Sequence, residues 1–413
     1  MSETALGDVR VLDLANEMGV YCTKLLADLG ADVIKIEPPG GDPMRLREPF
    51  FHDEPHPEKS LYWLHFNTSK RSVTLNLETA DGREMFKRLA KSADIVVETF
   101  PPGYLDRLGL GYSSLREINP RLIVCSITPF GQRGPYRSFK GGDLVGQCSG
   151  GQAHWLGYFD RPPVRHGCEQ AYHQTSLQAA HGILAALYHR DETGEGQHID
   201  VAMQECVVRG MQFSLNDYIM NKRTWGRTGI ERSPWPGVPV RQVFPCRDGY
   251  VSLVSFDITA PGGRLRELIE WMDSEGMAGS LKENLETYIQ NPVALDSDRV
   301  SVDEMVIDFF MKHTKDEIEK EGQRRGVLSA AVKDPRDVAE DEHLNARGYL
   351  VPIEHPELGA TITDVGPPYR LSLTPWRISR RAPLVGEHNL DVYVKELGYS
   401  AEKMAALKGH GVI

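Results

Sequence analysis

The sequence predicts an α/β protein with a Rossmann-like large domain and a smaller α+β domain. Short apolar runs alternate with amphipathic segments through the N-terminal third, which is the pattern of β-α-β units with parallel strands. The segment ANEMGVY follows the first predicted strand, where dinucleotide-binding proteins carry GxGxxG, so we expect no NAD site. Composition changes at residues 222–245, which are rich in Trp, Pro and Gly and indicate entry into a second domain.

Each predicted element follows from a local pattern of apolar residues and turn residues. In the large domain, the predicted strands are 9–14, 31–36, 94–98, 122–127 and 198–202, and the predicted helices are 21–29, 82–92, 113–118, 177–188 and 203–215. In the small domain we predict a strand at 250–255 and largely helical structure at 265–277 and 302–326. The expected domain limits are 1–215 for the first part of the large domain, 216–330 for the linker and small domain, and 331–413 for the return to the large domain.

Composition excludes several classes of protein. The 413 residues carry a formal net charge of -11, which disfavours wrapping of nucleic acid by clustered Lys and Arg. The six cysteines are scattered without a CxxC pair, so we expect free thiols in a reduced, cytoplasmic setting. No signal peptide and no apolar run of membrane-spanning length, about 18 residues, is visible. Four histidines between 166 and 189 are spaced too widely for a metal site, and we expect no bound metal.

Six segments, in this order, carry a resemblance to a known family. They are VLDLANEMGVYCTKLLADLGADVIKIEPPGGDPMR, FNTSKRSVTLNL, ADIVVETFPPGYLDRLGLGY, NPRLIVCSITPFGQRGPY, GILAALYHRDETGEGQHIDVAMQE and RAPLVGEHN. The chain is identified by them as resembling the class III CoA-transferases over residues 8 to about 210 and again near 335 to 398.

The resemblance implies a fold, an assembly and a reaction. Members have a Rossmann-like large domain built from the N-terminal half and the C-terminal tail, and two chains interlock like links. An aspartate attacks an acyl-CoA thioester, which gives an aspartyl anhydride and then an aspartyl-CoA thioester, so that CoA passes between two carboxylic acids. Coenzyme A and acyl-CoA are therefore expected as substrates, without a tightly bound cofactor.

Tyr172 occupies the place where the resemblance expects that aspartate. The family pattern puts the aspartate five residues after one glycine and ten before another, and Gly167 and Gly182 match these glycines. A phenol forms no anhydride, and its ordinary pKa of about 10 keeps it protonated at neutral pH. Glu169 takes the role only if the alignment shifts by three with compensating insertions. Met18 also departs from the pattern, because some members carry a polar residue there.

The resemblance also implies residues that contact CoA, whose phosphates need basic groups. Lys70 matches a family residue near the adenine end. Thr99, in place of an asparagine, and Phe100 match a pair beside the pantetheine arm. Arg107 matches a phosphate contact, Leu108 matches its neighbour, and Lys140 matches another basic contact.

Three functional hypotheses remain open from the sequence. The first is a CoA-transferase subunit whose nucleophilic aspartate is supplied by a homologous partner, with succinyl-CoA as the expected donor. The AYHQ segment resembles the aspartate-lacking subunit of the succinyl-CoA:benzylsuccinate CoA-transferase group. The second is a homodimeric CoA-transferase, or an acyl-CoA racemase or isomerase, using Glu169 or His173. Asp143 and His154 are further acid-base candidates, in surroundings unlike those of racemases. The third is a non-catalytic CoA-binding regulatory protein.

Overall fold

The computed structural model describes residues 4–211, 213–232, 240–253, 265–290 and 297–413. This part of the chain divides into two compact units. The larger unit comprises residues 1–153, 165–224 and 342–413, and the smaller unit comprises residues 154–164 and 225–341. Part of the predicted linker, residues 233–239, lies outside the described residues.

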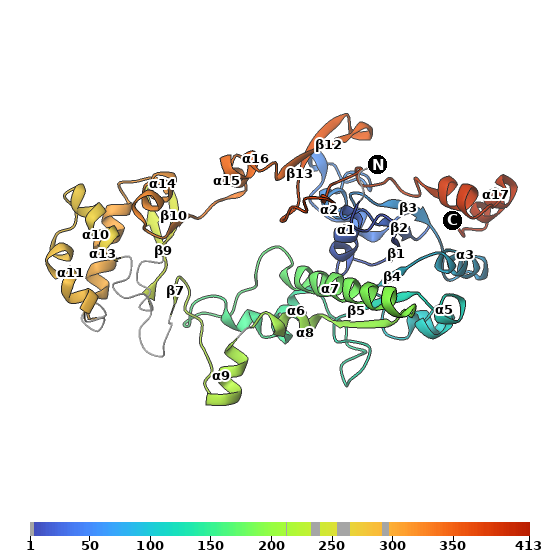
Figure 1. Cartoon of the computed structure of the whole chain (residues 1–413), viewed down its shortest axis with the longest axis horizontal. Coiled ribbons are helices and arrows are strands. Elements are labelled where there is room, and N and C mark those ends of the chain that lie inside the picture. Colours follow the sequence, from blue (N-terminus) through green and yellow to red (C-terminus); the bar gives the residue numbers. More distant parts are fainter. Residues whose placement is uncertain (1–3, 212, 233–239, 254–264, 291–296) are drawn as a thin grey trace. The chain divides into compact units, whose positions relative to one another are not determined.

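The larger unit is built on a six-stranded parallel sheet in the order β3-β2-β1-β4-β5-β6 (Figure 1). Its strands are β1 (Arg10–Leu14), β2 (Asp32–Glu37), β3 (Arg71–Thr74), β4 (Ile95–Glu98), β5 (Ile123–Thr128) and β6 (His198–Ala202). Its helices include α1 (Val20–Asp28), α2 (Leu61–Phe66), α3 (Ala80–Lys91), α4 (Tyr104–Arg107), α5 (Tyr112–Ile118), α6 (Asp143–Ser149), α7 (Gln170–Thr193), α8 (Met203–Arg209) and α9 (Phe213–Asn221).

Helices cover both faces of this sheet. Residues of β1 alternate between the two cores: Val11 packs with α1 and α7, whereas Leu12 packs with α3 and α5. The second core also receives the C-terminal segment, through Tyr393 of a π-helix (Leu390–Glu396) and Leu407 of α17 (Ala401–Gly409). The tail thus packs into the core of the larger unit. Between the smaller unit and the tail, the chain forms α16 (Glu342–Ala346). It then forms a hairpin of β12 (Leu350–His355) with β13 (Ala360–Val365).

The smaller unit packs helices against a three-stranded antiparallel sheet in the order β11-β10-β9. Its core contains Phe244, Trp271 and Phe309, all buried. The elements are β7 (Glu231–Arg232), β8 (Val240–Arg241), β9 (Val243–Cys246), β10 (Gly249–Leu253), α10 (Leu265–Ser274), α11 (Ser280–Gln290), α13 (Arg299–Phe310), α14 (Lys315–Arg325), β11 (Ser329–Ala331) and α15 (Pro335–Ala339).

Predicted and observed elements can be compared directly. The largely helical structure predicted at 302–326 is confirmed as two helices, α13 and α14, and Thr314 begins α14 with a capping box in which its side chain accepts from the Glu317 N–H. The predicted helix 203–215 ends at Arg209, and α9 follows. The larger unit resumes at Glu342, and β11 pairs with β10 of the smaller unit.

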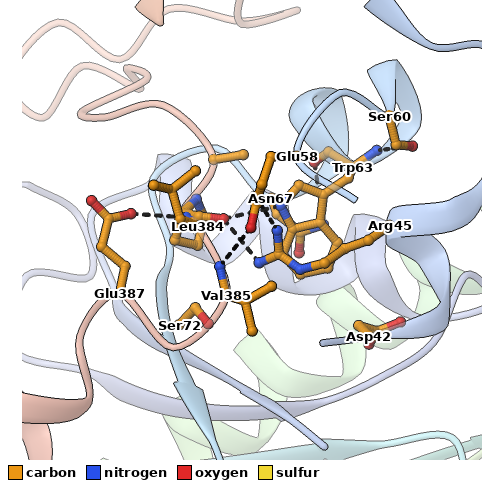
Figure 2. Close-up of polar contacts among 12 residues, drawn as sticks. Asp42, Arg45, Glu58, Ser60, Trp63, Asn67, Ser72, Leu384, Val385 and Glu387 are labelled. Carbon is orange, nitrogen blue, oxygen red and sulfur yellow. Dashed lines mark hydrogen bonds and ion pairs between the residues drawn. The ribbon is translucent and has the colours of Figure 1, made fainter. Parts of the chain in front are cut away.

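The segment RAPLVGEHN is fixed to the sheet through a buried arginine. Arg45, 1% exposed, donates two hydrogen bonds of 2.7 and 2.8 Å to the carboxylate of Glu37 at the end of β2. It also donates to Glu58 at 2.6 Å and to the carbonyl of Pro383 at 3.0 Å, and its guanidinium lies 3.7 Å from the ring centre of Trp63. Figure 2 shows how this group ties the tail to the loop before α2.

The tail completes the cluster with its own backbone. Trp63 Nε1 donates to the Pro383 carbonyl at 3.1 Å, and the Val385 N–H donates to Glu58 at 3.0 Å (Figure 2). The Gly386 N–H donates to Ser72 Oγ of β3 at 3.0 Å. We call Arg45, Glu37, Glu58, Trp63 and residues 383–386 the tail cluster.

Replacing Arg45 with Met should lower the free energy of unfolding by about 3–5 kcal/mol, because Glu37 then remains as a buried charge without its partner. Urea unfolding followed by tryptophan fluorescence measures this loss, since Trp63 lies against the replaced group. Arg116→Met is the matched control, because the Arg116 side chain is half exposed and its ion pair with Glu195 is 3.8 Å long. Equal stabilities of the two variants would contradict the structural role of the cluster.

Candidate functional site

The strand order of the sheet reverses between β1 and β4, and open α/β sheets bind ligands outside the carboxyl ends of the strands at such a point. Here the loop after β1 meets the segment after β4: the Asn16 N–H donates to Thr99 Oγ1 at 2.8 Å. The same loop meets α7, because Ser176 Oγ donates to the Met18 carbonyl at 3.1 Å. Three parts of the sequence therefore converge at this end of the sheet.

Tyr172 lies in the first turn of α7, next to this convergence. Asp143, the first residue of α6, holds that turn: its carboxylate accepts from the N–H groups of Ala171 at 2.8 Å and Tyr172 at 3.3 Å. The phenol oxygen lies close to Gly142, where an added Cβ would be 3.3 Å away. Burial, followed by the neighbouring charge of Glu17, raises the pKa of Tyr172 to about 12. The phenol is therefore neutral at physiological pH.

Glu169 is already engaged by two neighbours. Its carboxylate pairs with Arg47 and accepts a hydrogen bond from the Tyr62 hydroxyl at 3.0 Å. The Arg47 guanidinium also lies 4.1 Å from the centre of the Tyr62 ring. Glu169 and Cys168 both adopt left-handed backbone conformations, with φ of 48° and 58°, which non-glycine residues hold only when surrounding contacts fix them. Glu169 is thus held in an ion pair with Arg47, and its role as a nucleophile stays a prediction.

His173 packs among aromatic rings. Its ring centre lies 5.2 Å from Tyr21 and 5.9 Å from Phe66, and Nδ1 donates to the Glu169 carbonyl at 3.1 Å. The other acid-base candidates are also accounted for: Asp143 caps α7, and His154 Nε2 hydrogen-bonds the Trp225 carbonyl at 3.0 Å, within the smaller unit. None of these three side chains is left unengaged in the structure.

The structure separates the predicted CoA contacts into two groups. Lys70 is fully buried, and its ammonium donates to Asp13 at 2.9 Å, Thr23 at 2.8 Å and Asn67 at 3.0 Å. Burial lowers its pKa to about 8. The role of Lys70 toward CoA stays a prediction, and in the structure its ammonium is engaged by these three side chains. Lys70 stabilises the end of β1 through its buried pairing with Asp13.

The other predicted contacts lie near the site surface or beside it. Thr99 holds Asn16, and the Phe100 ring lies 4.6 Å from the ring of Tyr104 at an angle of 30°. Arg107 is exposed at the end of α4, 5.6 Å from the same Tyr104 ring, and Leu108 packs partly into the core. Lys140 is exposed on the loop between β5 and α6. Their roles toward CoA stay predictions.

Sequence reasoning missed Arg47, Tyr62 and Glu17. Glu17 is half-buried, and its charge is the largest influence on the pKa of the Tyr172 phenol after burial. All three residues lie in loops or in a six-residue helix, where no apolar period marks a position. The family resemblance points to Met18 and not to its neighbour Glu17. Their contacts with Glu169 and Tyr172 form only when the chain folds and brings α2, α7 and the loop after β1 together.

Comparisons with known proteins identify the family of the chain. The model of CoA-transferase family III matches residues 6–389. The chain belongs to this family. It is 33% identical over 410 residues to the subunit BbsE of succinyl-CoA:(R)-benzylsuccinate CoA-transferase from Thauera aromatica, covering 98% of this chain and 97% of that protein. It is also 33% identical over 426 residues to formyl-CoA:oxalate CoA-transferase from Streptomyces avermitilis, covering 99% of each.

A solved structure shares the fold. A CAIB/BAIF family protein from Brucella suis superposes with a TM-score of 0.79 at 29% identity, covering 95% of this chain and 99% of that one. Within the described ranges, no helix combines the length and apolarity that crossing a bilayer requires. Over the same ranges, no group of three His, Cys, Asp or Glu side chains is arranged to hold a metal ion.

Glu98 gives a pH test of this end of the sheet. It ends β4 with 5% exposure, accepts from the Phe100 N–H at 2.7 Å, and has a pKa that burial raises from 4.5 to about 7. The folded state therefore keeps this proton to a higher pH than the unfolded chain, so stability falls as pH rises from about 4.5 to about 7. Glu98→Gln should remove this loss and exceed the wild-type free energy of unfolding by about 3 kcal/mol at pH 8, but not at pH 4.5.

Urea unfolding across this pH range measures the difference. Glu195→Gln is the control, because the Glu195 side chain is 69% exposed. A parallel pH dependence of wild type and Glu98→Gln would show that this carboxyl titrates normally in the fold.

Proposed function

We propose that this chain is the non-nucleophilic subunit of a heteromeric class III CoA-transferase, acting on succinyl-CoA and an acceptor carboxylic acid. The observation that carries the proposal is the neutral phenol of Tyr172, which lies in the first turn of α7, where the family resemblance expects an aspartate. The similarity to BbsE, whose name describes a subunit of a succinyl-CoA-dependent transferase, supports both the heteromer and the donor.

The proposed reaction needs a carboxylate from a homologous partner subunit. Its oxygen attacks the thioester carbonyl carbon, the C–S bond breaks, and CoA leaves as a thiolate, which gives a mixed anhydride. The thiolate then attacks the aspartyl carbon, releasing succinate and forming aspartyl-CoA. The acceptor carboxylate displaces the thiolate in turn, and the thiolate attacks the acceptor acyl carbon, which restores the aspartate.

Tyr172 cannot replace this carboxylate in any step. A phenol that attacked the thioester would give an aryl ester, and its pKa of about 12 leaves almost no phenolate for that attack at pH 7. Glu169 would first have to leave Arg47 and Tyr62. The structure thus favours the heteromer over a homodimer that uses Glu169.

The surface of α7 supports a second chain as its neighbour. Leu177, Leu184 and Tyr188, spaced by seven and four residues, form an apolar stripe on the exposed side of this helix. The opposite side carries Ala179, Ile183 and Ala186 into the core. A stripe of large apolar side chains on a helix surface is typical of a protein interface. We include the interlocked arrangement of this chain with its homologue in the proposal.

The chain alone should show no CoA exchange, and co-expression with a homologous aspartate-containing subunit should give exchange between succinyl-CoA and an acid. Tyr172→Asp should restore an acyl or CoA adduct on this chain, detected by mass spectrometry of its peptides after incubation with succinyl-CoA. Tyr172→Asn is the matched control, since it has the same shape without a nucleophile. Exchange by the unaltered chain alone, abolished in Glu169→Gln or Glu17→Gln, would overturn the proposal.

Leu184→Glu combined with Tyr188→Glu should weaken the assembly at least tenfold, because two charges then enter an apolar contact. Co-purification of the two subunits and sedimentation velocity measure this change. Lys91→Glu on α3, which lies on the other face of the sheet, is the control and should leave assembly unchanged. Intact assembly of the double variant would place the partner elsewhere.

A further inference from the structure

A cavity of about 490 Å³ lies between the start of β12 and the coil segment 367–378, which follows β13. All of its lining residues belong to the larger unit. None of the residues considered above for CoA or for the transfer reaction lines it. Small-molecule sites have volumes of roughly 300–1,000 Å³, so this cavity is large enough for a compact organic ligand. Its chemistry is therefore a separate question from that of Tyr172.

Backbone contacts with the body of the larger unit fix one wall of the cavity. The Arg377 N–H donates to the carbonyl of Asp28, the last residue of α1, at 3.0 Å. Two residues later, the Ser379 N–H donates to Ser69 Oγ at 3.0 Å. Trp376, next to the first of these contacts, is 6% exposed. The wall that carries Trp376 and Arg377 is thus held in place by α1 and by the loop before β3.

The lining carries positive charge that is not neutralised. Arg370 and Arg377 line the cavity, and no acidic side chain of the described residues does. Over the described ranges, neither guanidinium forms a hydrogen bond or an ion pair. The Arg370 guanidinium lies beside the start of β12, because a Cβ added at Gly348 would be 3.8 Å from its Nη2. On a chain with a formal net charge of -11, two unpaired arginines at one cavity favour an anion as the ligand.

The rest of the lining is mostly apolar. Val351, Leu371 and Ile378 line the cavity, together with two prolines and the rings of Tyr369 and Trp376. An inorganic anion would lose water to these side chains without gaining hydrogen bonds from them. An apolar group, in contrast, gains free energy when such surfaces remove it from water. The lining therefore favours a ligand that joins an apolar body to one anionic group.

Trp376 adds a hydrogen-bond donor that lacks an acceptor. Its side chain is almost fully buried, and its Nε1 has no hydrogen-bond partner among the residues that the structure describes. Native proteins leave few buried donors in this state, because an unmade hydrogen bond is unfavourable once water is excluded. A ligand oxygen in the cavity that Trp376 lines would supply the missing acceptor.

We propose that this cavity binds an apolar monocarboxylic acid, with its carboxylate at Arg370 and Arg377 and its body against Val351, Leu371 and Ile378. An arginine fork matches the two oxygens of a carboxylate and stays charged at every physiological pH. An ionised carboxylate offers about four acceptor positions, so it can accept from the arginines and from the buried indole N–H together. The proposal does not depend on the transfer reaction.

Calorimetric titration of the purified chain with 4-phenylbutyrate and with its amide, 4-phenylbutyramide, tests the site. The acid should bind saturably and at least tenfold more tightly than the amide, because the amide has the same body without the charge. Arg370→Gln combined with Arg377→Gln should remove this preference and leave the affinity for the amide unchanged. Arg209→Gln combined with Arg336→Gln is the matched control, since both arginines are exposed and the change in net charge is the same.

Leu371→Asn tests the apolar part of the site separately. It should weaken the acid and the amide by the same factor, because both ligands place the same body against this side chain. Leu371 is 39% exposed, so the variant should keep its fold, and thermal unfolding checks this. Weaker binding of the acid alone would contradict the proposed placement of the body.

Absence of saturable binding of the acid, or full affinity for the acid in the double variant of Arg370 and Arg377, would overturn the proposal. The second result would place the acid elsewhere on the chain, including at the candidate transfer site. Sedimentation velocity without ligand should give the same oligomeric state for the wild-type chain and this double variant. A changed state would assign the lining to a contact between chains and would also overturn the proposal. Loss of CoA exchange in the assay with the partner subunit would affect the proposed function alone.

Discussion

The bidentate pairing of Arg45 with Glu37 is the interaction on which the rest of the larger unit depends. It fixes the end of β2, holds the loop before α2 through Glu58, and receives the C-terminal tail at the Pro383 carbonyl. That loop also carries Arg47, whose pairing with Glu169 sets the start of α7. A buried ion pair adds little net stability over a packed apolar group, but it accepts only one geometry, so it specifies how these segments meet.

Buried charged side chains stabilise the carboxyl end of the sheet by pairing with one another in the interior. Asp13 at the end of β1 accepts from Lys70 at 2.9 Å and lies 3.8 Å from Lys35, and all three are almost fully excluded from solvent. Lys35 and Lys70 hold the pKa of Asp13 below its usual value against the effect of burial. This network keeps the loop after β1 in place, and with it Asn16 and Met18, which reach β4 and α7. These buried side chains thereby position the residues of the candidate site, although they do not themselves lie on its surface.

The sequence could predict the parallel sheet because buried strands leave continuous apolar runs, and β1, β2, β4 and β5 lie within two residues of their expected limits. It could not predict β3, whose four residues, RSVT, carry no run of that kind. The assignment of Tyr172 to the position of the family's aspartate rests on the family resemblance, through the glycines at 167 and 182, and stays a prediction. The burial of Lys70 and the pairing of Glu169 did not follow from the sequence, because both depend on residues more than 50 positions away. The sequence alone does not show whether a charged residue of a motif faces a ligand or the core.

The tail cluster has a consequence for how the protein is made. Arg45 and Pro383 are 338 residues apart, and every residue of the smaller unit lies between them. At about 5–20 residues per second, the ribosome needs roughly 20 to 70 seconds to supply the second partner after the first. The smaller unit has left the ribosome by then, while Glu37 and Arg45 still lack the carbonyl that closes their environment. The larger unit is therefore the last to mature, because its buried arginine is enclosed only once residues 383–386 have been made.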